Sequence, residues 1–130
     1  MPDDPGSGDR REAVKKSVEI RVEPDEAAAL QAAADVFRET ARSAVATAGC
    51  ASIAISGGRT PRGMHRLLSR PPYAAGISWD RVHLFWTDER LVSHEHPASN
   101  FGAARTDFLQ FLPRSPGGLH PVPVSSDGDA

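Results

Sequence analysis

Short apolar runs alternate with amphipathic helical patterns along this 130-residue chain, and no other feature limits its fold as much. Apolar runs at residues 17–22, 51–55 and 81–86 predict strands. Helical patterns occupy residues 24–49 and 61–69 and a stretch that Ser99 is expected to cap. Residues 119–124 predict a further extended segment. This order favours parallel strands joined by right-handed helical crossovers. The sequence therefore predicts an α/β fold with a three-layer, Rossmann-like, mostly parallel sheet and helices on both faces.

The first half of the pattern gives specific expectations. Residues 17–22 alternate apolar and polar positions, which predicts a half-buried strand near a sheet edge. The next helix should hold Pro24 in its first turn, end at Gly49 and bury one apolar stripe. Residues 51–55 predict a central strand buried on both faces, and Cys50 beside it is expected in the core. The stripe consists of Leu30, Ala34, Phe37, Ala41, Val45 and Ala48.

Composition and charge narrow the class of protein. Residues 1–16 mix charges with Pro and Gly and are expected to form a frayed tail before an α/β region at 17–130. The 15 basic and 17 acidic residues leave a net charge of −2, which argues against a nucleic-acid partner. No stretch reaches the length of a membrane span. The single cysteine, Cys50, cannot form an internal disulfide, so we expect a reduced, cytoplasmic setting.

The segment "SGGRTP" at residues 56–61 joins a predicted strand to a predicted helix. Thr60 suits the N-cap and Pro61 the first helical position, while Gly57 and Gly58 let the backbone approach a ligand. The N–H groups of the first turn, the hydroxyls of Ser56 and Thr60 and the charge of Arg59 together suit a phosphate. The segment lacks the ending of a P-loop, so a nucleoside triphosphate is not indicated. An ordinary tight turn is the alternative.

A second polar cluster, "TDER" at residues 87–90, follows the next predicted strand. Ligands of open α/β sheets lie at the carboxyl ends of the strands, so the two clusters are expected to share one cleft. Arg90 could bind a phosphate or stabilise an oxyanion, and Asp88 could order a sugar hydroxyl, transfer a proton or hold Arg90. A surface ion pair between Arg90 and Asp88 or Glu89 is the alternative. His94 and His96 lack a third ligand at a suitable spacing, so no metal site is predicted.

Three ordered segments, "SGGRTP" at 56–61, "WDRVHLFWTDER" at 79–90 and "SNFGAARTDFL" at 99–109, resemble the 6-phosphogluconolactonase family. That family shares a superfamily with glucosamine-6-phosphate isomerase/deaminase. The resemblance implies metal-free, cofactor-free hydrolysis of 6-phosphogluconolactone to 6-phosphogluconate in the oxidative pentose phosphate pathway. It implies that Ser56, Gly57, Gly58 and Thr60 help to hold the phosphorylated sugar. Asp88 and Arg90 are then implied to face the active site as its catalytic residues.

The chain departs from the family in its length and in one motif. Members carry a later "GDGH"-like segment whose histidine is the implied general base, and "SSDGDA" at 125–130 has no such histidine. We therefore expect an N-terminal half that is truncated before the base, with a complementing C-terminal half as a candidate partner. A non-catalytic sugar-phosphate-binding module is the alternative. An isomerase/deaminase is disfavoured because that branch usually has Tyr where this chain has Arg90.

Overall fold

The computed structural model describes residues 17–124 and begins its regular structure with one long helix. Helix α1 spans Glu26–Ala48, and Asp25 caps it by accepting a hydrogen bond from the Ala28 N–H at 2.8 Å. Pro24 thus precedes the cap instead of opening the first turn. Gly49 ends the helix with a left-handed φ of 82°, as the sequence predicts. The apolar stripe is confirmed at its centre, where Ala34, Phe37 and Ala41 are buried.

Within residues 17–124, three short parallel strands form the sheet in the order β1–β2–β3. They are β1 (Ala51–Ile55), β2 (Val82–Trp86) and β3 (Gly118–His120), so the predicted strands at 51–55 and 81–86 and the extended segment near 119 are confirmed. Strand β1 pairs with β2 from Ala51 opposite Val82 to Ile55 opposite Trp86. Parallel pairing places the carboxyl ends of β1 and β2 side by side.

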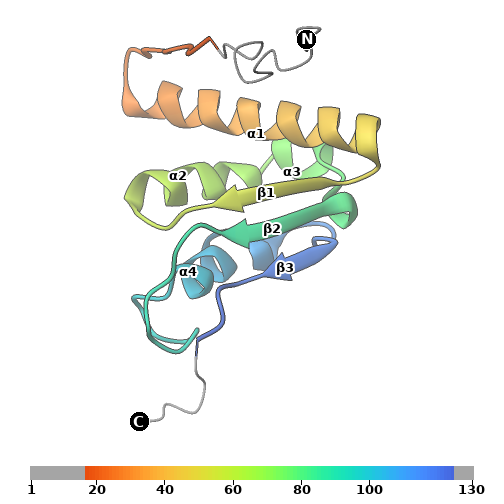
Figure 1. The fold of residues 1–130 in the computed structure, drawn as a ribbon. Helices are drawn as coiled ribbons and strands as arrows, with labels where there is room; N and C mark the ends of the chain where they lie inside the picture. The colour runs from red at the N-terminus through yellow and green to blue at the C-terminus, as the bar shows by residue number, and fades with distance from the viewer. Residues whose placement is uncertain (1–16, 125–130) are drawn as a thin grey trace, which may run out of the picture.

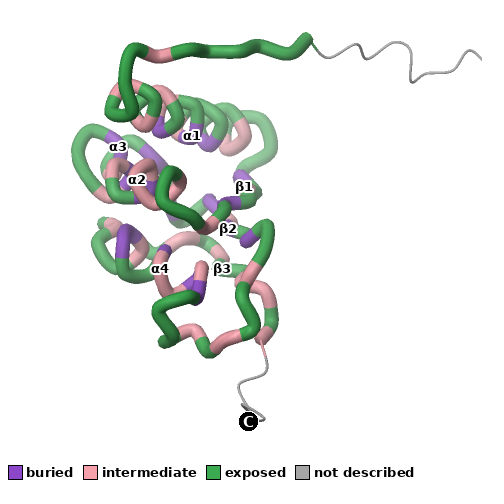
Figure 2. The backbone as a smooth tube through the Cα atoms, turned by 90° about the vertical axis from the view of Figure 1, so that its left-hand side faces the viewer, coloured by how far each residue is buried: buried purple, intermediate pink, exposed green. Residues whose placement is uncertain are grey.

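Helices connect these strands and lie on one side of the sheet. Helices α2 (Arg59–Leu68) and α3 (Tyr73–Gly76) lie between β1 and β2, and α4 (Asn100–Asp107) lies between β2 and β3. Two 3₁₀ turns, η1 at Trp79–Arg81 and η2 at Leu109–Phe111, complete the connections. In Figure 1 α1 runs alongside β1, and Figure 2 places α2, α3 and α4 on the same side of the strands. The predicted α/β, parallel, crossover architecture is therefore confirmed.

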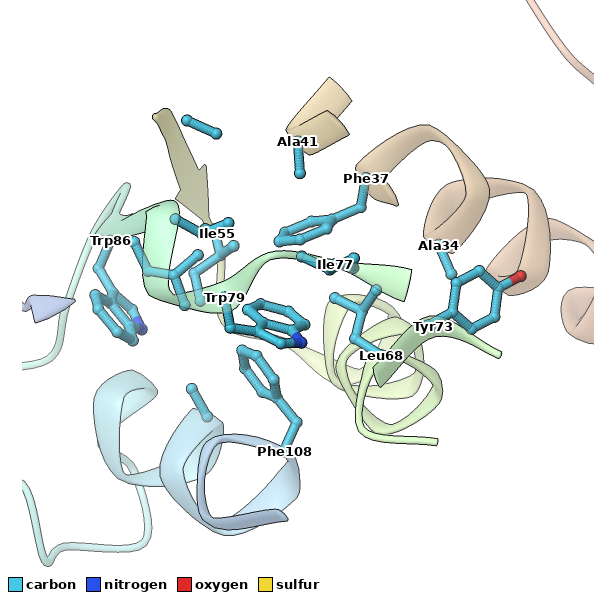
Figure 3. Packing of buried hydrophobic residues seen from close by; sticks show 14 of the residues in the cluster. Ala34, Phe37, Ala41, Ile55, Leu68, Tyr73, Ile77, Trp79, Trp86 and Phe108 are labelled. Carbon is cyan, nitrogen blue, oxygen red and sulfur yellow. The ribbon is translucent and has the colours of Figure 1, made fainter. Parts of the chain in front are cut away.

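The core lies between the sheet and these helices (Figure 3). The Trp79 ring is fully buried, with ring centroids 5.8 Å from Phe37 and 6.2 Å from Phe108. Its indole N–H donates to the Ala74 carbonyl at 3.0 Å, so the one polar atom of the ring is satisfied. Trp79 is thus a packing residue that contacts Phe37 of α1 and Phe108 at the end of α4.

The opposite face of the sheet is exposed in residues 17–124. Alternate strand positions point there, and they include Ala54, His83, Phe85 and His120. The Phe85 ring, 40% exposed, stacks on His120 at 4.4 Å between ring centroids. No helix of the described chain covers this face, so the second helical layer of the predicted three-layer fold is not found in these residues.

Two predictions at the start of the chain are wrong. Residues 17–22 form no strand, and Val18, Ile20 and Val22 are 82–89% exposed. The segment runs past the side of α1 that is remote from the sheet, so it lies out of reach of any strand edge (Figure 1). Cys50 is exposed because it belongs to the turn after Gly49 rather than to β1.

Strand β1 also differs from its prediction. It lies at the edge of the described sheet rather than in the centre, and Ser52 and Ala54 are exposed on the open face. Only Ala51 and Ile55 are fully buried, on the face that meets the helices. A continuous apolar run is therefore compatible with a strand covered on one face, because small residues such as Ala54 fit either environment.

Candidate functional site

The segments "SGGRTP" and "TDER" begin side by side at the carboxyl ends of β1 and β2. The Thr87 N–H donates to the Ile55 carbonyl at 3.0 Å, which extends the strand pairing by one residue. The hydroxyls of Ser56 and Thr87 then lie 2.9 Å apart and share a hydrogen bond. The structure therefore brings together the two clusters that the sequence assigned to one cleft.

The start of α2 forms the first wall of the site. The helix begins at Arg59 after Gly58, whose φ of 105° lies in the region that favours glycine. Thr60 is thus the second helical residue rather than the N-cap, and Pro61 is the third rather than the first. The N–H groups of Arg59 and Thr60 have no acceptor within the helix, because the first turn always leaves such groups unpaired. The phosphate site stays a prediction, and these two N–H groups are its candidate donors although the cap differs.

Asn100 at the start of α4 connects the two clusters. Its side-chain amide donates to the Asp88 carboxylate at 3.2 Å and to the Asp88 carbonyl at 3.3 Å. A Cβ added at Gly57 would lie 2.0 Å from Asn100 Oδ1, so only glycine permits this contact. Gly57 is therefore required by the close approach of α4 to the loop after β1. This arrangement leaves the Asp88 side chain exposed and held in one orientation.

Glu89 has a structural role that the sequence did not indicate. Its carboxylate accepts hydrogen bonds from the N–H groups of Asn100 at 2.7 Å and Phe101 at 2.9 Å, so it caps α4 from another segment. Ser99 caps the same helix by accepting from the Gly102 N–H at 3.0 Å, as predicted. Burial alone raises the pKa of Glu89, but these hydrogen bonds outweigh burial and the net pKa is lowered.

Arg90 is exposed beside this cap. Its backbone N–H donates to the Glu89 carboxylate at 2.8 Å, yet no ion pair joins its guanidinium to Asp88 or Glu89 among residues 17–124. The structure thus does not support a simple surface ion pair within "TDER". Asp88 and Arg90 are left exposed on either side of a residue that fixes the loop.

A partly buried ion pair joins α2 to α4 behind the site. Arg62 donates to both carboxylate oxygens of Asp107, at 2.7 Å from Nε and 3.2 Å from Nη2. Asp107 is 8% exposed, and Arg66 approaches the same carboxylate at 3.5 Å. Burial raises the pKa of Asp107, but the hydrogen bond and charge of Arg62 lower it further than burial raises it. This pair positions α4, and its two partners are too far apart in sequence for a local pattern to reveal it.

His65 lies in the core against the same helices. It is 2% exposed, its ring stacks on Phe108 at 4.9 Å between centroids, and both ring nitrogens lack a hydrogen-bond partner. Burial lowers its pKa to about 4, so this ring is neutral at pH 7 and remote from solvent. His94 and His96 lie in the loop after β2, and no group of three or more metal-ligating side chains occurs in the part of the chain described.

Comparisons with known proteins agree with this fold and these segments. The model of the glucosamine-6-phosphate isomerases/6-phosphogluconolactonase family matches residues 24–130. A 6-phosphogluconolactonase from Nostoc is 34% identical over 117 residues, which cover 90% of this chain and 46% of the relative.

No helix within residues 17–124 is long and apolar enough to cross a membrane.

Solved structures give the same result. A Shewanella baltica 6-phosphogluconolactonase superposes with a TM-score of 0.72 and 27% identity, covering 85% of this chain and 45% of that structure. A Trypanosoma cruzi 6-phosphogluconolactonase gives 0.74 and 28%, covering 88% and 42%. The chain thus spans less than half the length of these relatives. On the family match and these likenesses, the chain belongs to the glucosamine-6-phosphate isomerase/6-phosphogluconolactonase family.

Proposed function

We propose that this chain provides the substrate-binding part of a 6-phosphogluconolactonase. The observation that carries the proposal is the contact network at the carboxyl ends of β1 and β2. Asn100 contacts Gly57 and donates to Asp88, so the anion-binding loop and the acidic loop face one site. The relatives named as 6-phosphogluconolactonases support the substrate class, a phosphorylated sugar lactone.

In this proposal the unpaired N–H groups of Arg59 and Thr60 and the hydroxyls of Ser56 and Thr60 bind the phosphate. Neutral and charged donors at a helix start favour a dianion, and the open space beside Gly58, where an added Cβ would meet only Pro61 Cδ at 3.8 Å, admits it. Binding at that end brings the sugar towards Asp88 and Arg90. Asp88 then orients a sugar hydroxyl or transfers a proton, and Arg90 stabilises the negative charge that develops on the lactone carbonyl oxygen.

Hydrolysis also needs a base that takes a proton from the attacking water before the ring ester bond breaks. The buried His65 cannot supply it because its nitrogens face the core. We propose that the base comes from a segment beyond the described residues or from a complementing C-terminal half. The complete enzyme would then act in the cytoplasm, in the pentose phosphate pathway. The relatives are more than twice as long as the part of them that this chain matches, which leaves room for such a segment.

The binding step is tested first because it does not need the base. Calorimetric titration of the chain with 6-phosphogluconate should show saturable binding, and Gly57→Ala should weaken it about tenfold or more by displacing Asn100. Gly76→Ala is the matched control, since its added Cβ meets only Arg38 Cδ at 3.6 Å. Equal affinity in Gly57→Ala and Gly76→Ala would contradict the proposed site.

The catalytic step is tested by the rate of loss of freshly prepared 6-phosphogluconolactone against spontaneous hydrolysis. Acceleration that disappears in Arg90→Ala supports a lactonase. Binding of 6-phosphogluconate without acceleration supports the second candidate, a non-catalytic sugar-phosphate-binding module. That candidate needs only the binding contacts at the ends of β1 and β2, where Asn100 meets Gly57 and donates to Asp88.

A further inference from the structure

We propose that the groove between α2 and α4 is a second anion site, which binds a ligand with two linked phosphate groups. The groove has a volume of about 350 Å³. Arg59, Arg62 and Arg66 line one wall from α2, and the small residues Ala98, Ser99 and Ala103 line the other wall. It adjoins the candidate site at Gly58 and Asn100, and it lies on the side of α2 that faces α4. Asp88 and Arg90 do not line it.

The spacing of the arginines places them on one face of α2. Residues three and seven positions apart share a helix face, so Arg59, Arg62 and Arg66 form a row along the groove. Seven residues of α-helix correspond to a rise of about 10 Å, which separates Arg59 from Arg66. A single phosphate at the start of α2 cannot engage the whole row, whereas two linked phosphates extend along it.

The charges in the groove are not balanced by the protein. Within residues 17–124, Asp107 is the one carboxylate that contacts this row, and Arg62 occupies both of its oxygens. Arg66 is left with one long contact of 3.5 Å and half of its side chain exposed, and no ion pair of Arg59 is recorded within residues 17–124. Like charges on one helix face repel each other, so a bound polyanion relieves that repulsion. Guanidinium groups also match phosphate oxygens in bidentate geometry.

The rest of the groove is suited to a ligand of this kind. The N–H groups of Asn100 and Phe101 at the start of α4 are occupied by Glu89, so the attraction comes from the arginines rather than from that helix end. The Ala98 and Ala103 side chains keep the second wall open. The ligand class is therefore a diphosphate or bisphosphate, bound by Arg59 and Arg66. Arg62 remains paired with Asp107 and keeps α2 against α4.

The test uses pyrophosphate as the probe and isothermal titration of the whole chain at low ionic strength. We expect saturable binding, tighter than that of inorganic phosphate, with a loss of about tenfold or more in Arg66→Ala. Arg42→Ala, on the exposed side of α1, is the control and should leave the affinity unchanged. Amide chemical shifts in the unmutated chain should move at Arg59, Arg66, Ala98 and Ala103, which tests the site without relying on the fold of a variant.

Competition separates this inference from the proposed function. If pyrophosphate binds while 6-phosphogluconate occupies its own site, and Arg66→Ala weakens only pyrophosphate, the second site is supported. Full competition between the two ligands would overturn the second site and leave the proposed function intact. Pyrophosphate binding without any 6-phosphogluconate binding would support the groove and refute the proposed function. Absence of saturable pyrophosphate binding, or shifts confined to the loop at 56–60, would also overturn the inference.

Discussion

Glu89→Ala is the substitution that most sharply separates structure from chemistry in this site, because Glu89 lies between two candidate functional residues. The carboxylate receives the N–H groups of Asn100 at 2.7 Å and Phe101 at 2.9 Å, together with a longer contact of 3.4 Å from the Ser99 hydroxyl. Removing it leaves the first turn of α4 without these acceptors. We therefore expect a loss of folding stability, with an indirect effect on ligand binding.

The size of the loss follows from the two short bonds. A hydrogen bond to a charged group contributes about 1.5–3 kcal/mol, and water that reaches the half-buried site recovers part of it. The expected loss in the free energy of unfolding is about 2–4 kcal/mol, a large part of the total stability of a domain of this size. Because the bonds need an ionised carboxylate, the lowered pKa of Glu89 means that its contribution is present above its unfolded pKa. The contribution is lost as the pH falls through the lower folded pKa.

Urea unfolding at pH 7, followed by circular dichroism, measures this change. Glu95→Ala is the matched control, because Glu95 lies in the same loop and its 3.8 Å contact with Arg105 is exposed; we expect a change below about 0.5 kcal/mol there. Binding of 6-phosphogluconate by folded Glu89→Ala should weaken because Asn100 loses its anchor. Equal stability of Glu89→Ala and Glu95→Ala would refute the capping role.

The remaining predictions concern the core and the ion pair. Between pH 6.5 and about 4, His65 protonates in the unfolded chain but stays neutral in the folded one, so the protein loses about 3 kcal/mol of folding free energy. His65→Leu should therefore flatten this fall in the free energy of unfolding. Urea titrations at several pH values measure the slope, and an unchanged slope contradicts the buried neutral state. Asp107→Asn should cost about 1–3 kcal/mol in the same assay at pH 7, since it leaves the 40%-exposed side chain of Arg62 without its carboxylate partner. A neutral result argues against a structural pair. Gly49→Ala should lower the free energy of unfolding by about 1 kcal/mol, because alanine rarely adopts a φ of 82°, although the added Cβ meets no atom within 4 Å. Calorimetric melting measures the change, and an unchanged transition would contradict the role of the left-handed cap.

Local patterns were sufficient to predict much of the fold. The three-to-four spacing of apolar residues predicts α1, and Gly49 predicts its end, because both depend on neighbouring positions. The capping role of Ser99 and the strands at 51–55 and 82–86 were confirmed for the same reason. The alternating residues 17–22 failed because a strand also needs a partner edge, which no pattern within one segment can specify.

The candidate site was predictable in position but not in detail. The glycines and polar residues after the strands indicated where the loops meet, at the hydrogen bond shared by Ser56 and Thr87. The capping role of Glu89 and the pairing of Arg62 with Asp107 depend on how α4 is placed, which is tertiary information. The helix start at Arg59 was missed because Thr60 was the predicted N-cap, whereas Gly58 occupies that position and the helix begins two residues earlier.

The central claim is that the loops after β1 and β2 form one site for a phosphorylated sugar acid. Amide chemical-shift mapping of the chain with 6-phosphogluconate, compared with gluconate, tests it most directly. We predict shifts at Gly57, Gly58, Thr60, Asp88 and Asn100 that saturate with 6-phosphogluconate and are weak with gluconate, because the phosphate provides most of the attraction. Equal responses to both ligands, or shifts that avoid these two loops, would contradict the claim.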